Sequence, residues 1–328
     1  MLQAGPTRTT PVLIADIGGS TSRFALAECG REPQQVIAVS NANFATLEAA
    51  IAQYLDHAAV RPRAAIFAVA GPIDGQDVAL TNRRWGFRVR DLAARFGFDR
   101  LQVVNDFEAL AWALLGLDAS KVRSIGANVR ADAGVKVVLG PGTGLGVAAL
   151  VPCGQEWRVV ASEGGHVFFG PATAEERPVF EWLWQEYGHI SAEMVLSGPG
   201  LCRLYRAVNS GQALPDPETI VAMARAGDTA GRAATSLFIR LLGRFAGSLA
   251  LTFKASGGVY LAGGVITALA AMLDDAQFRA AFEAHPPHQA LLARIPTSLV
   301  TCAEPGLLGC AALVERWTDS EDVRGANS

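Results

Sequence analysis

The sequence predicts an α/β protein built from two lobes. The chain has 328 residues, which exceeds the usual size of a domain with a single hydrophobic core. Half of the residues (50%) are hydrophobic, which is enough to fill two cores. Short apolar runs of buried-strand length alternate with longer segments whose apolar residues recur at helical spacing. An apolar run that enters a glycine turn and leaves as a second apolar run occurs twice. This repetition indicates an internal duplication, with one copy in each lobe.

The first lobe opens with a β-hairpin. Val12–Ile17 is an apolar run, the turn begins with Gly18, Gly19 and Ser20, and Phe24–Ala27 is a second apolar run. Adjacent glycines leave backbone N–H groups without steric cover, so the turn can bind phosphate oxygens. Glycine pairs are also common in bare hairpin turns, and from this turn alone that interpretation is favoured.

Further strands and helices complete the first lobe. Residues 42–57 carry apolar residues at helical spacing, and Ala64–Ala70 is a continuous apolar run of buried-strand length. Leu101–Val104 is another short strand, and it stops at Asn105 and Asp106. In open α/β sheets, ligands bind at the C-terminal ends of the strands. This position therefore predicts a polar site.

Asn105 and Asp106 are the most specific pair of candidate catalytic residues in the chain. A hydroxyl that attacks a γ-phosphate needs a carboxylate to receive its proton, and a neighbouring amide can orient the same substrate. The alternative is that the pair only caps the helix expected at Phe107–Leu117. Both roles can hold at once, with one side chain capping while the other acts on the substrate.

The second lobe repeats the opening of the first. After a polar crossing between Gly116 and Val135, the apolar runs Val135–Leu139 and Val147–Val151 flank a turn that contains Gly142, Thr143 and Gly144. Glycine stands at every second position from 140 to 146, and this density indicates phosphate contact or very close backbone packing. Neither glycine turn has the Lys-Ser or Lys-Thr of a P-loop or the GxGxxG spacing of a dinucleotide-binding turn, which disfavours both folds.

The remaining elements of the second lobe include a long helix. It is expected over Asp228–Lys254, with Arg240 and Arg244 one turn apart on its solvated face. A strand then enters the turn at Gly263 and Gly264. The final helix, over residues 304–317, is assigned to the first lobe. The predicted lobes are residues 1–116 with 304–328 and residues 117–303.

Two acidic residues and a histidine indicate a site for a polyhydroxylated ligand. Glu163 and His166 flank a glycine pair, and Glu193 follows in the segment Gly188–Glu193. Sugar hydroxyls donate and accept hydrogen bonds, so carboxylates beside a neutral imidazole suit a sugar pocket. From either motif alone, a solvated carboxylate and a partly buried histidine are favoured. Partners at metal-ligand spacing for a Zn²⁺ site are lacking.

Composition narrows the partners to small molecules or a second copy of the chain. A net charge of −3 leaves no broad basic surface for nucleic acid or an anionic membrane. Five widely spaced cysteines without a CxxC pair indicate reduced thiols in a cytoplasmic protein. The first ten residues lack the apolar core of a secretory signal. The uncharged stretches 137–155 and 255–273 are broken by glycines, so no transmembrane helix is expected.

Read together, these segments resemble the bacterial glucokinase family, in the group without a zinc-binding cysteine cluster, within the hexokinase-like and actin-like ATPase superfamily. EGGH followed by SAE-x-VLSGPGL is a highly specific pattern. The matching segments cover most of the chain in order: ADIGGSTSRFAL (15–26), AVAGPIDGQDVALTNRRWGF (68–87), VVNDFEALA (103–111), GPGTGLGVA (140–148), SEGGHVFFGP (162–171), GHISAEMVLSGPGLCRLYRA (188–207) and GGVYLAGGV (257–265).

The resemblance implies a two-lobed actin-like ATPase (ribonuclease H-like) fold, with mixed sheets flanked by helices around a central cleft. It also implies a role for each matched residue. Asp106 matches the catalytic base, and Asn105, Asn82, Glu163, His166 and Glu193 match glucose ligands. ATP-binding positions are matched by Asp16, Gly18, Gly19, Ser20, Gly142, Thr143, Gly144, Gly263 and Gly264. No residue is assigned as a direct metal ligand: Mg²⁺ is expected to arrive with ATP, with Asp16 reaching it through water.

The implied activity is transfer of the ATP γ-phosphate to the 6-hydroxyl of D-glucose, at the entry to glycolysis, by a cytoplasmic homodimer. One departure from the family pattern is visible, because Thr21 stands where an asparagine is usual. The nearest alternative is a kinase of another hexose. A sugar-responsive regulator that does not phosphorylate is disfavoured, because only about ten residues precede the first strand, too few for a DNA-binding helix pair. A third alternative is a structural ATPase that does not respond to glucose.

Overall fold

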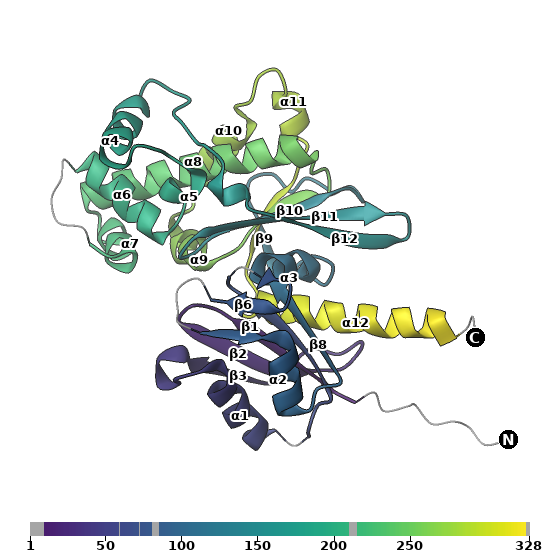
Figure 1. Ribbon diagram of the computed structural model, residues 1–328. Coiled ribbons are helices and arrows are strands. Elements are labelled where there is room, and N and C mark those ends of the chain that lie inside the picture. Colours follow the sequence, from purple (N-terminus) through teal and green to yellow (C-terminus); the bar gives the residue numbers. More distant parts are fainter. Residues whose placement is uncertain (1–9, 59, 72, 81–84, 210–214, 326–328) are drawn as a thin grey trace. The chain divides into compact units, whose positions relative to one another are not determined.

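The computed structural model describes residues 10–58, 60–71, 73–80, 85–209 and 215–325, with side chains described as far as Trp317 (Figure 1). The chain forms two compact units. Unit 1 comprises Met1–Leu117 and Ala303–Ser328, and unit 2 comprises Asp118–Cys302. Each unit contains a hydrophobic core of its own.

Unit 1 is built on a five-stranded mixed sheet with the order β3-β2-β1-β4-β8. β1 pairs antiparallel with β2 and parallel with β4; β2 and β3 are antiparallel, and β4 and β8 are parallel. A small second sheet joins β5, β6 and β7. The strands are β1 (Val12–Ile17), β2 (Thr21–Ala27), β3 (Gln34–Ser40), β4 (Ala64–Val69), β5 (Ile73–Asp74), β6 (Asp77–Ala79), β7 (Gly86–Arg88) and β8 (Arg100–Asn105).

Strand alternation in β1 places Asp16 opposite the core of unit 1. Leu13, Ala15 and Ile17 join the apolar cluster that also contains residues of α1 and α2. Asp16 points the other way, where Gly306 of α12 packs against its carboxylate. Figure 1 shows α12 in yellow, alongside the sheet strands that it contacts. The helices of unit 1 are α1 (Leu47–His57), α2 (Val89–Phe96), α3 (Asp106–Ala113), α12 (Pro305–Gly325) and a 3-10 turn (Asn41–Asn43).

Unit 2 repeats this sheet. Its order is β12-β11-β10-β13-β14-β9, and the first five strands reproduce the order and directions of the sheet in unit 1. The antiparallel strand β9 is added at one edge. The repeated topology agrees with the duplication expected from the two glycine hairpins. The strands are β9 (Val122–Ser124), β10 (Lys136–Pro141), β11 (Leu145–Cys153), β12 (Glu156–Ser162), β13 (Gly258–Leu261) and β14 (Thr297–Val300).

Helix α8 (Thr229–Phe253) supplies much of the core of unit 2. It begins at the N-cap Asp228, whose carboxylate accepts a hydrogen bond from the Gly231 N–H at 2.7 Å. Among the described residues it is the helix long and apolar enough to cross a membrane, but 61% of its apolar window is buried, as in a core helix. The other helices are α4 (Arg177–Tyr187), α5 (Ala192–Val195), α6 (Gly198–Val208), α7 (Pro217–Arg225), α9 (Gly264–Leu269), α10 (Asp275–Glu283), α11 (Gln289–Leu292) and the 3-10 turns Gly164–His166 and Ala270–Met272.

The expectation that Arg240 and Arg244 face solvent is wrong for Arg244, whose side chain is 14% exposed, and holds only in part for Arg240, at 36%. Both guanidinium groups approach Glu176, whose side chain is only 2% exposed, at 3.6 and 3.3 Å. Arg244 also donates to the Gly170 carbonyl at 2.7 Å and stacks over the Phe169 ring. Burial of the Glu176 carboxylate requires these partners, because an unpaired charge in a protein interior is strongly unfavourable.

Candidate active site

The first glycine turn joins β1 and β2 in unit 1, where sequence analysis placed one end of ATP. Ile17 pairs with Ser22, and the Gly18 N–H donates to the Thr21 carbonyl at 3.1 Å, which closes the turn. A buried contributor that was not predicted from the sequence is Asn41, whose side chain donates to the carbonyls of Gly18 and Gly19. No motif marked Asn41, because its link to the turn arises from the pairing of β2 with β3.

Asp16 lies beside this turn in a restricted space. A Cβ atom at Gly306 would lie 2.7 Å from Asp16 Oδ2, so glycine is required where α12 begins. Arg23 Nη1 is 3.9 Å from the same oxygen, and the Arg23 guanidinium also pairs with Glu304. Burial raises the pKa of Asp16 to about 6; Arg23 opposes the shift and Glu304 adds to it.

Asn105 and Asp106 both cap the helix that follows them, which is one of the two roles that the sequence left open. Asn105 is the N-cap of α3, because its Oδ1 accepts from the Phe107 N–H at 2.9 Å. Asp106 is the first residue of the helix, and its Oδ1 accepts from the same N–H at 3.0 Å. Burial raises the pKa of Asp106 to about 7, and the nearby Asp16 carboxylate adds to the shift. A carboxylate with this pKa is matched to proton transfer near neutral pH.

The second glycine turn, in unit 2, is held by a carboxylate. Glu193 Oε2 accepts from the Leu145 N–H at 2.8 Å, and a Cβ at Gly144 would lie 2.5 Å from that oxygen. The Gly142 N–H donates to the Gly144 carbonyl at 2.8 Å, and the Gly142 carbonyl accepts from Gly198 at the same distance. Glu193 was predicted as a sugar ligand only, so its bond to the turn is an addition.

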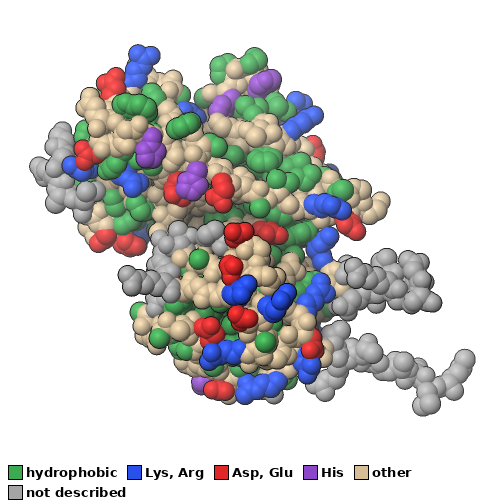
Figure 2. Space-filling view, in the orientation of Figure 1, with side chains coloured by type: hydrophobic (Ala, Val, Ile, Leu, Met, Phe, Trp, Pro, Cys, Tyr) green, Lys and Arg blue, Asp and Glu red, His purple; other side chains and the backbone are tan. Residues whose placement is uncertain are grey.

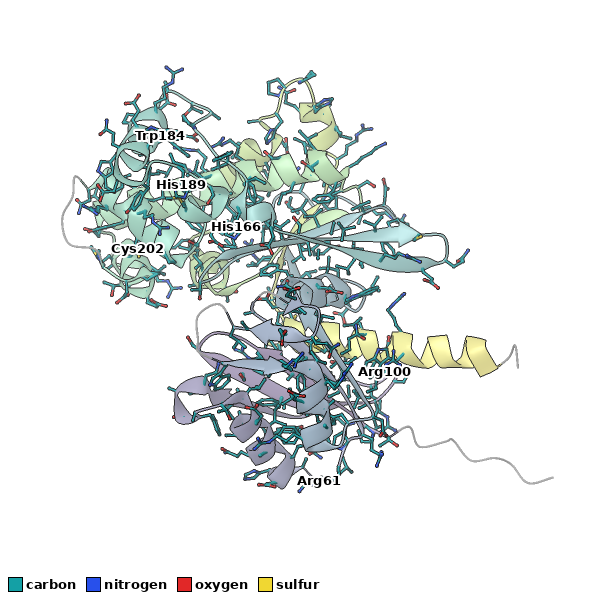
Figure 3. The ribbon with its side chains drawn as sticks, viewed as in Figure 1. Arg61, Arg100, His166, Trp184, His189 and Cys202 are labelled. Atoms are coloured by element: carbon teal, nitrogen blue, oxygen red, sulfur yellow. The ribbon has the colours of Figure 1, made fainter. Side chains whose placement is uncertain are left out.

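Glu163, His166 and Glu193 gather on one face of unit 2. His166 Nε2 is 3.9 Å from Glu163 Oε2, and His166 Nδ1 is 4.0 Å from Glu193 Oε1. In Figure 2 a histidine at this place has acidic side chains on both sides, and Figure 3 labels His166 there. The Glu163 and His166 side chains are 90% and 61% exposed, while Glu193 is 32% exposed. This cluster can donate and accept hydrogen bonds toward a polyhydroxylated ligand.

The turn at Gly263 and Gly264 lies against the second glycine turn. Gly263 has φ of +98° and precedes α9, and a Cβ there would lie 2.6 Å from the Pro141 carbonyl oxygen. Only glycine tolerates both the backbone angle and the contact. Unit 2 therefore brings together the two glycine segments that were predicted to bind ATP. Asn82, predicted as a sugar ligand, lies outside the described residues.

The described residues contain no group of three or more His, Cys, Asp or Glu side chains arranged to hold a metal ion directly. Asp16 nevertheless fits a hydrated Mg²⁺. It is a partly buried carboxylate near a second carboxylate, Asp106, and both have pKa values raised by burial. A divalent cation would offset the mutual repulsion of the two, and oxygen donors are the ligands that Mg²⁺ prefers.

A family model described as Glucokinase matches residues 13–317. The chain belongs to the glucokinase family. This confirms both the family resemblance and the two-lobed α/β fold class predicted from the sequence. The chain is 42% identical to the glucokinase of Chelativorans sp. (strain BNC1) over 310 residues, 92% of this chain and 90% of that protein.

Two solved glucokinases share the fold along nearly the whole chain. The glucokinase from an Antarctic psychrotroph has a TM-score of 0.86 and 34% identity, and the match covers 94% of this chain and all of that one. The glucokinase from Balamuthia mandrillaris, solved in complex with glucose, has a TM-score of 0.77 and 25% identity over 94% of both chains.

Proposed function

We propose that this protein transfers the γ-phosphate of ATP to the 6-hydroxyl of D-glucose. Membership of the glucokinase family supports this activity. The observation that carries the chemistry is Asp106, a carboxylate at the C-terminal end of β8 with its pKa raised to about 7. A base poised near the operating pH accepts a proton most effectively.

In the proposed reaction, each side chain keeps the role predicted from the sequence. Asp106 takes the proton of the 6-hydroxyl while that oxygen forms a bond to the γ-phosphorus, and the bond to the β,γ-bridging oxygen breaks to release ADP. Asn105, Glu163, His166 and Glu193 hold the sugar hydroxyls. The two glycine turns bind phosphate oxygens through backbone N–H groups. Most of the acceleration then comes from positioning and charge neutralisation.

Asp16 is the residue proposed to hold Mg²⁺, through a water molecule. When bound with ATP, the cation neutralises charge on the phosphate oxygens. The product, glucose 6-phosphate, enters glycolysis. We place the reaction in the cytoplasm, where ATP is available and where cysteines stay reduced.

The decisive experiment is a coupled assay of ADP release with a panel of hexoses. ATP consumption that requires glucose, with glucose 6-phosphate as the product, supports the proposal. A clear preference for mannose, fructose or an amino sugar would transfer the proposal to that hexose. Sugar binding by calorimetry without turnover would indicate a regulator instead, and ATP turnover that ignores every sugar would indicate a structural ATPase.

We also propose a homodimer, formed through an exposed apolar surface of unit 2. Val167, Phe168 and Trp184 are 51%, 86% and 59% exposed, and the surface borders a groove of about 820 Å³ (Trp184 is labelled in Figure 3). Large exposed apolar patches mark interaction sites. Arg177 and Glu181 lie one turn apart on α4 at the same groove. In a two-fold dimer, Arg177 can face Glu181 of the second copy, so the surface complements itself.

Light scattering tests this surface. The protein is expected to have twice the mass of the chain, and Phe168→Ser with Trp184→Ser is expected to give the mass of one chain while glucose-dependent turnover persists. Val36→Ser, a change at an exposed apolar residue of unit 1, is the matched control. A monomeric wild type, or a double variant that remains dimeric, would contradict this interface.

A further inference from the structure

A buried amide side chain supports the first glycine turn from within unit 1. Asn41 begins the 3-10 turn that follows β3, and it is completely buried. Its Nδ2 donates to the Gly18 carbonyl at 2.8 Å and to the Gly19 carbonyl at 3.2 Å. Its backbone N–H donates to the Ser20 carbonyl at 2.9 Å. One residue therefore binds three successive carbonyl oxygens of the turn.

This arrangement determines where the N–H groups of the turn point. Within one planar trans peptide the C=O and N–H bonds point in opposite directions. Because the carbonyls of Gly18 and Gly19 point toward Asn41, the N–H groups of Gly19 and Ser20 point away from it. Across the described part of the chain, neither N–H donates to a protein acceptor. Two adjacent donors are thus free on the outer side of the turn, as anion binding requires.

The amide of Asn41 is itself held in one orientation. Ser22, also completely buried, donates its hydroxyl to Asn41 Oδ1 at 2.7 Å. A hydroxyl donor at this oxygen leaves the NH₂ group as the side that faces the carbonyls. A carboxylate at this position would set negative charge against two carbonyl oxygens in a buried site, where such an arrangement is strongly unfavourable.

We propose that Asn41, oriented by Ser22, is a positioning residue that holds the first glycine turn in its phosphate-binding conformation. The inference rests on the proposed function, because it assigns a ligand group to this turn. The ligand class is the phosphate chain of a nucleoside triphosphate.

The experiment compares Asn41→Asp with Asn43→Asp in the full-length protein. Asn43 is exposed in the same 3-10 turn, so the control introduces the same charge at the surface. KM for ATP and for glucose are measured by the coupled assay, and affinities for ADP and glucose by calorimetry. For Asn41→Asp we expect KM for ATP and Kd for ADP to rise about tenfold or more, while the glucose constants stay within about twofold.

Ser22→Ala is the second, milder variant. It removes only the hydroxyl that orients Asn41, so we expect a smaller change in the same direction, and it decides the question if Asn41→Asp does not fold. A purely structural role would lower the melting temperature without separating the ATP constants from the glucose constants. Unchanged ADP affinity in a folded Asn41→Asp protein, or in Ser22→Ala where the first variant is unfolded, overturns the inference.

The same measurements separate this inference from the proposed function. A wild type that phosphorylates no hexose contradicts the proposed function, while ADP calorimetry still tests Asn41. An active wild type whose Asn41 variant binds ADP normally contradicts only the inference.

Discussion

The two glycine turns occupy equivalent places in the two units but are supported by different chemistry. Each follows the first strand of the repeated five-stranded sheet. In unit 1, the neutral amide of Asn41 binds the turn carbonyls from 22 and 23 residues further along the chain. In unit 2, the carboxylate of Glu193 binds the Leu145 N–H, and the Gly198 N–H binds the Gly142 carbonyl, both from helices about fifty residues further along.

The difference shows how each turn is connected to the other ligand-binding residues. Glu193 Oε2 holds the second turn while Oε1 lies 4.0 Å from His166, so one side chain joins that turn to the proposed sugar residues. Asn41 joins the first turn to Ser22, and both are in unit 1. A disturbance of the first turn should therefore affect the nucleotide alone, whereas a disturbance of the second should affect both substrates.

The largest effect is expected at Asp106, beside the first turn. Asp106→Asn removes the proton acceptor and should lower kcat by about 10² to 10⁴ fold, the range for general base catalysis, while ADP still binds. If Asp106→Asn loses turnover but still binds ADP in calorimetry, the residue acts in the chemical step and not in nucleotide binding. Glu108→Gln, on the same helix, is the control and should stay near wild type. Near-normal turnover of Asp106→Asn would remove Asp106 from the role of base.

Gly144→Ala tests the second turn directly. The added Cβ would lie 2.5 Å from Glu193 Oε2, so the carboxylate must shift. Because Glu193 contacts both regions, we expect KM to rise for ATP and for glucose, each about tenfold. Gly170→Ala has open space around the new Cβ and serves as the matched control in unit 2. A rise in KM for ATP with an unchanged KM for glucose would contradict the proposed connection between the second turn and the sugar-binding residues.

Glu193→Gln tests the same connection between the second turn and the sugar-binding residues, with a smaller expected change in KM. Glutamine retains an oxygen that can accept from the Leu145 N–H, so the turn should persist and KM for ATP should change little. Loss of the charge near His166 should raise KM for glucose several-fold, on the order of 1 kcal/mol. Equal changes in both constants would show that the charge, and not only the acceptor, supports the turn.

The smallest expected effect of a substitution is a shift in the midpoint of the pH profile, which should depend on residues of unit 1. Asp106 must be ionised to act as a base, so kcat/KM should fall about tenfold per pH unit as the pH drops below about 7, its raised pKa. The Asp16 carboxylate adds to this elevation, so Asp16→Asn should move the midpoint to lower pH. Arg177→Gln in unit 2 should leave the midpoint unchanged. A midpoint that Asp16→Asn does not move would contradict the proposed coupling.

Sequence patterns predicted the buried strands better than the edge strands. The runs that became β1, β4 and β10 are mostly apolar because both faces of each strand are largely covered; Asp16 in β1 and Lys136 in β10 are the charged exceptions. The outer strands β3 and β12 are largely exposed and were not predicted. β3 contains the apolar run Val36–Val39, but this run was left unassigned, and the apolar residues of β12 are interrupted by Arg158. Missing β3 also meant missing Asn41, which follows its last residue.

By itself, the sequence determined the family, the fold class and the types of residue available for catalysis, because local motifs such as EGGH and the glycine turns are contiguous. Tertiary structure alone decided which side chains support those motifs. Asn41 and Asn43 look equivalent in the sequence, and Arg240 and Arg244 look solvated. Burial and hydrogen bonding depend on which elements pack together, so only the folded chain places Asn41 under a turn more than twenty residues away and Glu176 between two arginines.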